Sequence, residues 1–146
     1  MPKSSRDILI SVENQYVEKM LDGTKMVELR RRVLSLEEGS HVWIYSKIPT
    51  GRLMACGIVE HVFKAAPIDI WDHYGDVSGV TKAEFDTYFD AVECGCAIVF
   101  SSVSELHNKI SLKSIRDVLG DFHPPQFFKN LSSGSPELKL FRNCSA

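Results

Sequence analysis

The sequence predicts an α+β domain in which a small, mostly antiparallel β-barrel is flanked by short helices. Several short runs of apolar residues alternate with polar ones and are joined by turn-forming residues, which is typical of hairpin-linked strands. Segments with helical spacing are too few to cover both faces of a parallel sheet. The chain has 146 residues, 44% of them hydrophobic and 25% charged, which favours a single globular domain over 1–146.

The first thirty residues are predicted to form a strand, a helix and a second strand. Asp7 to Val12 is rich in Ile, Leu and Val, and Glu13 to Asp22 changes to helical spacing. Gly23 is expected to end this helix in the left-handed conformation, which glycine adopts without steric cost. Lys25 to Arg30 alternates with a period of two, so we expect a strand with one polar face.

The middle of the chain is predicted to contain a hairpin and then helices. His41 to Tyr45 and Leu53 to Phe63 are strand-like, and a proline, a threonine and a glycine between them suit a tight turn. Residues 65–93 are expected to form a helical insertion. Within it, the capping-box pattern that begins at Thr81 predicts a helix from Thr81 to Val92.

The last fifty residues are predicted to contain one strand and one helix. Cys96 to Val103 is strand-like, and Ser111 to Leu119 has helical spacing that ends at a glycine. A pair of prolines then begins a short turn that carries aromatic residues. We expect a short C-terminal tail from about residue 132.

Charge is unevenly distributed along a chain whose formal net charge is −2. The first 64 residues contain ten Lys or Arg and eight Asp or Glu, whereas residues 65–100 contain one base and seven acids. This balance excludes a strongly basic nucleic-acid coat protein but permits a local basic patch, with a solvated charged face as the alternative. The candidate bases are Lys25, Arg30, Arg31, Arg32, Lys47 and Arg52, with Lys109, Lys113 and Lys129 further along the chain.

The lengths of the apolar runs and the spacing of cysteine and histidine argue against several classes of protein. The apolar runs are far shorter than the roughly 18 residues of a membrane span, and no hydrophobic segment near the N-terminus is long enough for a signal peptide. We therefore expect a cytoplasmic protein without a membrane partner. The four cysteines and five histidines match no zinc spacing, and no phosphate-binding glycine loop or nucleophile elbow is present. We expect no metal and no cofactor.

One motif gives the sequence its most specific signal. Residues Gly23 to Arg30 have the form G-x-K-x-x-E-x-R, after a helix and running into a strand. Here the chain resembles the ASCH family, a branch of the PUA-like superfamily. The resemblance extends to the preceding segment Tyr16 to Leu21 and the strand Val42 to Ser46, and more weakly to Pro125 to Phe128. It implies a PUA-like β-barrel.

The chemistry of the motif independently favours a ligand pocket. Gly23 lets the chain turn sharply and leaves room for a ligand near the backbone, and Lys25 follows at the rim. Glu28 and Arg30 are two residues apart on one strand, so they project to the same face and can hold each other, or a base edge and a phosphate. The alternative is a structural surface ion pair worth at most about 1 kcal/mol. A lysine beside a glycine turn favours the pocket.

Aromatic side chains are expected to provide a stacking wall for this pocket. A base that stacks on an aromatic ring gains about 1–3 kcal/mol. Among the candidates, Tyr45 is favoured because the polar residues Ser46 and Lys47 follow it, with packing in the core as the alternative. The candidates are Tyr16, Trp43, Tyr45 and Phe127.

The resemblance implies two classes of function, of which the first is a binding module. PUA-like domains bind RNA or modified nucleobases, so the ligand would be RNA or a modified nucleoside held by the motif. Glu28 would accept hydrogen bonds from an exocyclic amine. Arg30 and Lys25 would neutralise a phosphate or hold a carbonyl. The sequence does not indicate which nucleic acid or nucleoside binds, nor the oligomeric state.

The second class is a small hydrolase. Some small members of the family hydrolyse the amide of acetylated cytidine with the motif lysine, a threonine three residues later and a distant glutamate, and at least one member is a ribonuclease. This chain has Lys25 and offers Glu84 as the distant acid, but Glu28 occupies the threonine position and cannot act as a hydroxyl nucleophile. Hydrolysis with Glu28 as a general base on water is the remaining enzymatic alternative.

Overall fold

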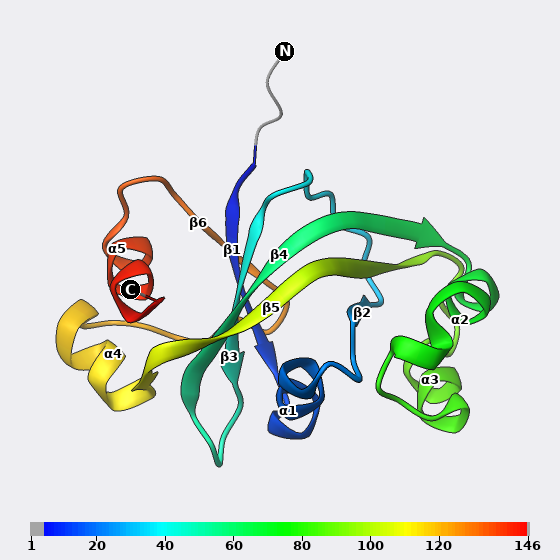
Figure 1. Ribbon diagram of the computed structural model, residues 1–146, viewed down its shortest axis with the longest axis horizontal. Coiled ribbons are helices and arrows are strands. Elements are labelled where there is room, and N and C mark those ends of the chain that lie inside the picture. Colours follow the sequence, from blue (N-terminus) through cyan, green and yellow to red (C-terminus); the bar gives the residue numbers. More distant parts are fainter. Residues whose placement is uncertain (1–4, 146) are drawn as a thin grey trace.

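A six-stranded sheet organises residues 5–145, the part of the chain that the structure, a computed structural model, describes (Figure 1). The strand order is β2-β5-β4-β3-β1-β6, and neighbouring strands are antiparallel except for the parallel pair β1 and β3. Residues 1–4, which belong to the segment assessed for a signal peptide, lie outside the described residues. The strands are β1 (Asp7–Val12), β2 (Val27–Arg30), β3 (His41–Ser46), β4 (Arg52–Ala65), β5 (Gly95–Ser111) and β6 (Lys129–Leu131).

The helices gather in separate groups around this sheet. Figure 1 shows α2 and α3 at one end of the long β4 and β5 pair, and α4 and α5 toward its other end. None of the helices in the described part of the chain is long and apolar enough to cross a membrane. The helices are α1 (Asn14–Asp22), α2 (Pro67–Tyr74), α3 (Lys82–Tyr88), α4 (Leu112–Leu119) and α5 (Pro136–Ser145), with a 3-10 turn η1 at Gly75–Val77.

The predicted α+β class is confirmed, but the closed barrel is not. The sheet is open and mixed, with β2 and β6 as its edges. A barrel requires the two edge strands to pair with each other. Here the edge strands have only four and three residues, and they lie at opposite ends of the strand order. The hairpin signals in the sequence predict neighbouring strands, but they do not determine whether the sheet closes.

Several local predictions are confirmed. The first strand spans the predicted Asp7–Val12, and Gly23 ends α1 with φ +89°, in the left-handed region. Strands β3 and β4 form the predicted antiparallel hairpin. The hydroxyl of Thr81 accepts a hydrogen bond from the backbone N–H of Glu84, whose carboxylate accepts one from the Thr81 N–H, so the capping box is present.

Other elements differ from the prediction because tertiary contacts determine them. Strand β6 and helix α5 were not predicted from the sequence. Strand β6 is only three residues long and forms by pairing with β1, and α5 is fixed by the burial of Leu138 and Phe141 in the core. Strand β5 extends to Ser111 along β4, although its second half is mostly exposed and polar. Helix α3 ends at Tyr88, four residues before the predicted Val92.

Three hydrophobic clusters lie against the sheet. One includes Val17 and Met20 of α1 and strand residues such as Ile44. A second lies beneath α4 and α5 and includes Tyr45. A third joins α2 and α3 to β2 and β5. Between α1, β2 and α3 the first and third clusters leave a space, which is the site described next.

Candidate functional site

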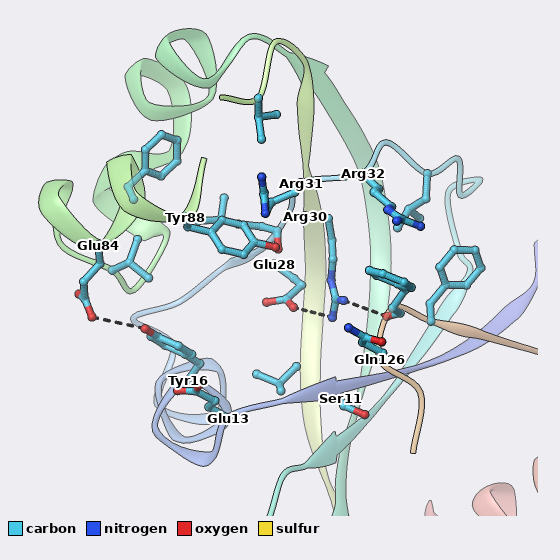
Figure 2. A pocket seen from close by; sticks show the side chains of 18 of the residues that line it. Ser11, Glu13, Tyr16, Glu28, Arg30, Arg31, Arg32, Glu84, Tyr88 and Gln126 are labelled. Carbon is cyan, nitrogen blue, oxygen red and sulfur yellow. Dashed lines mark hydrogen bonds and ion pairs between the residues drawn. The ribbon is translucent and has the colours of Figure 1, made fainter. Parts of the chain in front are cut away.

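A cavity of about 1040 Å³ lies between α1, β2, α3 and the segment before β6 (Figure 2). Pockets for small molecules have volumes of about 300–1,000 Å³, so this cavity is at or beyond the upper end of that range. Its walls come from parts of the chain that are far apart in sequence. Tyr16 and Tyr88 lie on one side, Glu28 and Arg30 in the middle, and Ser11 and Gln126 on the other side.

Five of the eight residues that the sequence predicted as ligand-binding or catalytic line the cavity, as do Tyr16 and Phe127 among the aromatic candidates. Gly23, Tyr45 and Ser46 do not line it. Gly23 has a conformational role, because its positive φ turns the chain out of α1 just before Lys25. The five candidates that line the cavity are Lys25, Glu28, Arg30, Lys47 and Glu84.

Tyr45 and Ser46 have structural roles in this arrangement. Tyr45 is 2% exposed and packs in the cluster beneath α4 and α5, where its hydroxyl has no hydrogen-bond partner among residues 5–145. The Ser46 hydroxyl donates a hydrogen bond of 3.0 Å to the side-chain oxygen of Asn14, at the start of α1. Strand β3 is internal and covered on both faces, so its alternation does not create an open face for Tyr45.

Glu28 and Arg30 form the predicted pair, but within the cavity wall. An Arg30 guanidinium nitrogen lies 2.8 Å from a carboxylate oxygen of Glu28, and the two side chains are 13% and 10% exposed. A second guanidinium nitrogen donates a hydrogen bond of 2.8 Å to the carbonyl of Phe127. The guanidinium therefore connects β2 to the segment before β6, and the pair is more buried than a surface ion pair.

Lys25 is the most buried charged residue of the motif. It is 3% exposed, its ammonium donates a hydrogen bond to the Ser78 carbonyl, and this nitrogen lies 5.3 Å from the centroid of the Tyr16 ring. Burial lowers the pKa of the Lys25 ammonium, and the nearby Glu28 carboxylate partly opposes this effect. A Cβ atom at Gly79 would lie 3.0 Å from the Lys25 side chain. The absence of a side chain at Gly79 therefore leaves room for the lysine.

Tyr16 and Glu84 meet across the cavity from α1 and α3. The Tyr16 hydroxyl donates a hydrogen bond of 3.4 Å to Glu84 (Figure 2). Hydrogen bonds from Thr81 lower the pKa of the Glu84 carboxyl, so it stays ionised as an acceptor. Burial, reinforced by the charge of Glu84, raises the pKa of the Tyr16 hydroxyl. Tyr16 is therefore a neutral phenol whose ring forms part of the wall.

Sequence reasoning missed three hydroxyl-bearing or polar residues of the cavity. The Ser11 hydroxyl donates a hydrogen bond of 2.7 Å to the Pro125 carbonyl, and the Tyr88 hydroxyl donates one of 3.2 Å to the Leu29 carbonyl. Gln126 also lines the space. The position of Tyr88 four residues after Glu84, on the same face of a helix, was the available signal. Ser11 has none, because an isolated serine in a buried strand does not indicate a site.

The charged residues that line the cavity favour an anionic ligand. Five are basic and three are acidic, although the whole chain has a net charge of −2. Within residues 5–145 there is no cluster of three or more His, Cys, Asp or Glu side chains that could together hold a metal ion. The lining bases are Lys25, Arg30, Arg31, Arg32 and Lys47, and the acids are Glu13, Glu28 and Glu84.

Comparisons with known proteins identify the fold. No family model matches the chain. A curated relative from Zymomonas mobilis subsp. mobilis, named ASCH domain-containing ribonuclease, is 22% identical over 121 residues, which cover 83% of this chain and 81% of the relative.

Crystal structures of the ASCH protein from Zymomonas mobilis superpose over nearly the whole chain. One has a TM-score of 0.85 at 22% identity and covers 94% of both chains. A tyrosine-to-phenylalanine variant has a TM-score of 0.88 at 20% identity, covering 97% of this chain and 99% of the other. A serine-to-alanine variant has a TM-score of 0.86 at 22% identity, covering 96% and 97%. The chain therefore has the fold of the Zymomonas mobilis ASCH protein, which agrees with the ASCH resemblance of its motif.

Proposed function

We propose that the cavity binds single-stranded RNA or a modified nucleobase. The observation that carries this proposal is the presence, in one cavity, of a buried lysine, an anchored Glu28 and Arg30 pair and two tyrosine rings. RNA recognition of this type places an unstacked base in a concave site where polar edges and aromatic rings read it. The relative that is named a ribonuclease supports RNA as the ligand class.

Each part of the nucleotide has a complementary group in the proposed site. One carboxylate oxygen of Glu28 holds Arg30, which leaves the other to accept hydrogen bonds from an exocyclic amine of a base. Lys25 and the Arg30 guanidinium supply positive charge for a phosphate or a carbonyl. The rings of Tyr16 and Tyr88 offer stacking surfaces.

A second candidate is RNA hydrolysis at the same place. The name of the curated relative favours it, and so does the lowered pKa of the Lys25 ammonium, which makes proton transfer by this lysine easier near neutral pH. In this alternative Glu28 would accept the proton of the attacking hydroxyl, and Lys25 would donate a proton to the leaving oxygen. The attacking hydroxyl would have to come from water or from the RNA itself, because the hydroxyls of Ser11, Tyr16 and Tyr88 already donate hydrogen bonds to neighbouring oxygens. We favour binding, which requires no attacking group.

Glu28→Gln distinguishes the two candidates. Wild type and variant would be incubated with acetylated cytidine and with short RNA, products would be followed by mass spectrometry, and binding would be measured by NMR titration. A binding module loses affinity and forms no product, whereas a hydrolase keeps most of its affinity and loses its rate. Glu37→Gln, at an exposed glutamate outside the cavity, is the matched control and should leave affinity unchanged.

We expect measurable binding without product, with shifts centred on residues 23–30 and affinity lost in folded Lys25→Ala and Arg30→Ala variants. Release of acetate or cut strands by the wild type, absent in Lys25→Ala and Glu28→Gln, would establish the hydrolase instead. Failure to bind any nucleoside or RNA would reject both candidates.

A further inference from the structure

An exposed stack of an arginine and a phenylalanine lies at the rim of the cavity. The guanidinium carbon of Arg32 is 4.0 Å from the centroid of the Phe127 ring. Both residues line the cavity and both are exposed, Phe127 to 47%. Phe128, which is 37% exposed, follows it. Exposed apolar side chains that lie together, rather than singly, can mark a binding surface.

The Arg32 and Phe127 stack differs from the Glu28 and Arg30 pair in the contacts that the guanidinium makes. The Arg30 guanidinium is anchored by Glu28 and by the Phe127 carbonyl. For the Arg32 guanidinium, by contrast, residues 5–145 offer no hydrogen-bond or ion-pair partner, and only the Phe127 ring lies beneath it. Its donors and its outer plane are therefore available to a ligand.

The rim and the motif lie in different parts of one cavity. Figure 2 shows Arg32 and Gln126 on the side opposite Tyr16 and Glu84, with Arg30 between them. The volume of about 1040 Å³ is at the upper end of the range for pockets that hold one small molecule. A ligand that fills this space reaches from the tyrosine side to the rim.

The backbone beneath the rim is fixed before any ligand arrives. Arg30 holds the carbonyl of Phe127, and the Ser11 hydroxyl holds the carbonyl of Pro125. The guanidinium carbon of Arg6 lies 5.9 Å from the centroid of the Phe128 ring. A preformed stacking surface loses little conformational entropy on binding, which favours affinity.

We propose that the Arg32 and Phe127 stack binds a second nucleotide, adjacent to the one held by Lys25, Glu28 and Arg30. The ligand class is then single-stranded RNA of two or more nucleotides, and a free nucleoside occupies only part of the site. RNA bases stack on arginine planes as well as on aromatic rings, and the same guanidinium pairs with a phosphate. This inference rests on the proposed function, because it extends the same cavity.

The test compares cytidine 5′-monophosphate with hexacytidylate at fixed salt, by isothermal titration with each variant. Wild type should bind the hexanucleotide more tightly than the mononucleotide. Arg32→Ala should reduce hexanucleotide affinity by about 5- to 150-fold, the range for loss of one stacked base, and should affect the mononucleotide much less. Phe127→Ala should have the same selective effect.

Two further variants separate the contribution of stacking to the affinity from that of the Arg32 charge and from that of basic residues elsewhere on the surface. Arg32→Lys keeps the charge but removes the planar guanidinium, so it should lose part of the hexanucleotide affinity and keep the salt dependence. Arg52 was a candidate base in the sequence, but it is exposed on β4 and does not line the cavity, so Arg52→Ala should leave both affinities unchanged. Circular dichroism checks that each variant is folded.

The experiment distinguishes failure of this inference from failure of the proposed function. If neither probe binds, both the proposed function and this inference are rejected. If both bind with equal affinity, or if Arg32→Ala behaves like Arg52→Ala, the inner site stands and the second nucleotide site is rejected. A selective loss of hexanucleotide affinity in both Arg32→Ala and Phe127→Ala supports the inference.

Discussion

Lys25 shows how burial changes the chemistry of one residue. Burial lowers the pKa of its ammonium below the ordinary value of 10.5, with Glu28 as a partial opposing influence. The charged form is therefore disfavoured in the folded protein. The contribution of Lys25 to the free energy of unfolding rises as pH increases through the lowered pKa toward 10.5, because the unfolded chain binds the proton more tightly.

The same shift predicts a pH dependence of ligand binding. As pH rises toward 10.5, Lys25 loses its proton at a lower pH than a free lysine does, so affinity for hexacytidylate should fall. Lys25→Met should bind more weakly at pH 7 and lack this part of the pH dependence. Titration calorimetry across the range measures it. A wild-type profile parallel to that of Lys25→Met would show that the ammonium does not contact the ligand.

Gly23 provides a prediction about stability. With φ +89° and open space around the position of a Cβ atom, alanine there meets no clash but is forced into the left-handed region. Gly23→Ala should lower the free energy of unfolding by about 1 kcal/mol. Gly23→Asn is the matched control and should cost less, since asparagine tolerates this conformation. Urea denaturation measures both, and equal stability of all three proteins would contradict the role of the turn.

At residue scale, local spacing predicted partners on one strand but not contacts between distant segments. Two-residue spacing correctly placed Glu28 beside Arg30. The same alternation could not tell that β3 is covered on both faces, so Tyr45 was expected at the site and lies in the core. Contacts such as the Lys25 ammonium with the Ser78 carbonyl join residues 53 positions apart, and no local pattern encodes them.

At the scale of elements, α5 is the helix that the sequence did not predict and on which one core cluster depends. Phe141 is fully buried among the residues beneath α4 and α5. Phe141→Ala should lower the free energy of unfolding by about 3–5 kcal/mol, because it removes a large buried ring. Lys139→Ala, on the exposed side of the same helix, should change it by no more than about 0.5 kcal/mol. Similar effects of the two substitutions in urea denaturation would show that α5 does not contribute to the core.

Elements with strong local signals were predictable, and those stabilised by distant partners were not. The capping box of Thr81 and Glu84, which involves residues only three positions apart, identifies the start of α3. Strand β6 has three residues and is defined by pairing with β1, more than a hundred positions away. Closure into a barrel was wrongly expected for a related reason, since hairpin signals do not determine how the edges of a sheet meet.

At the scale of the whole molecule, the basic residues of the cavity contrast with the net negative charge of the chain. If the cavity contacts phosphates, log affinity for hexacytidylate should fall linearly with log salt, with a slope of about 0.7 per contact. Lys47→Ala, which removes an exposed base of the cavity, should reduce the slope by about one contact. Fluorescence anisotropy from 50 to 300 mM salt measures it. A flat dependence with retained affinity would indicate a ligand held by stacking and neutral hydrogen bonds.

The open sheet also has a consequence for self-association. Its long strands, of 14 and 17 residues, are internal, and the strands at its edges have four and three. Strand β2 pairs with only Cys96 to Val99 of β5, and the remainder of β5 is mostly polar and exposed, which limits strand addition between molecules. Strand β6 pairs with Asp7 to Leu9 of β1, a strand in which four of the six residues are apolar and five are buried. If β6 detached, β1 would become an exposed apolar edge, so these three residues protect the protein from aggregation out of proportion to their number.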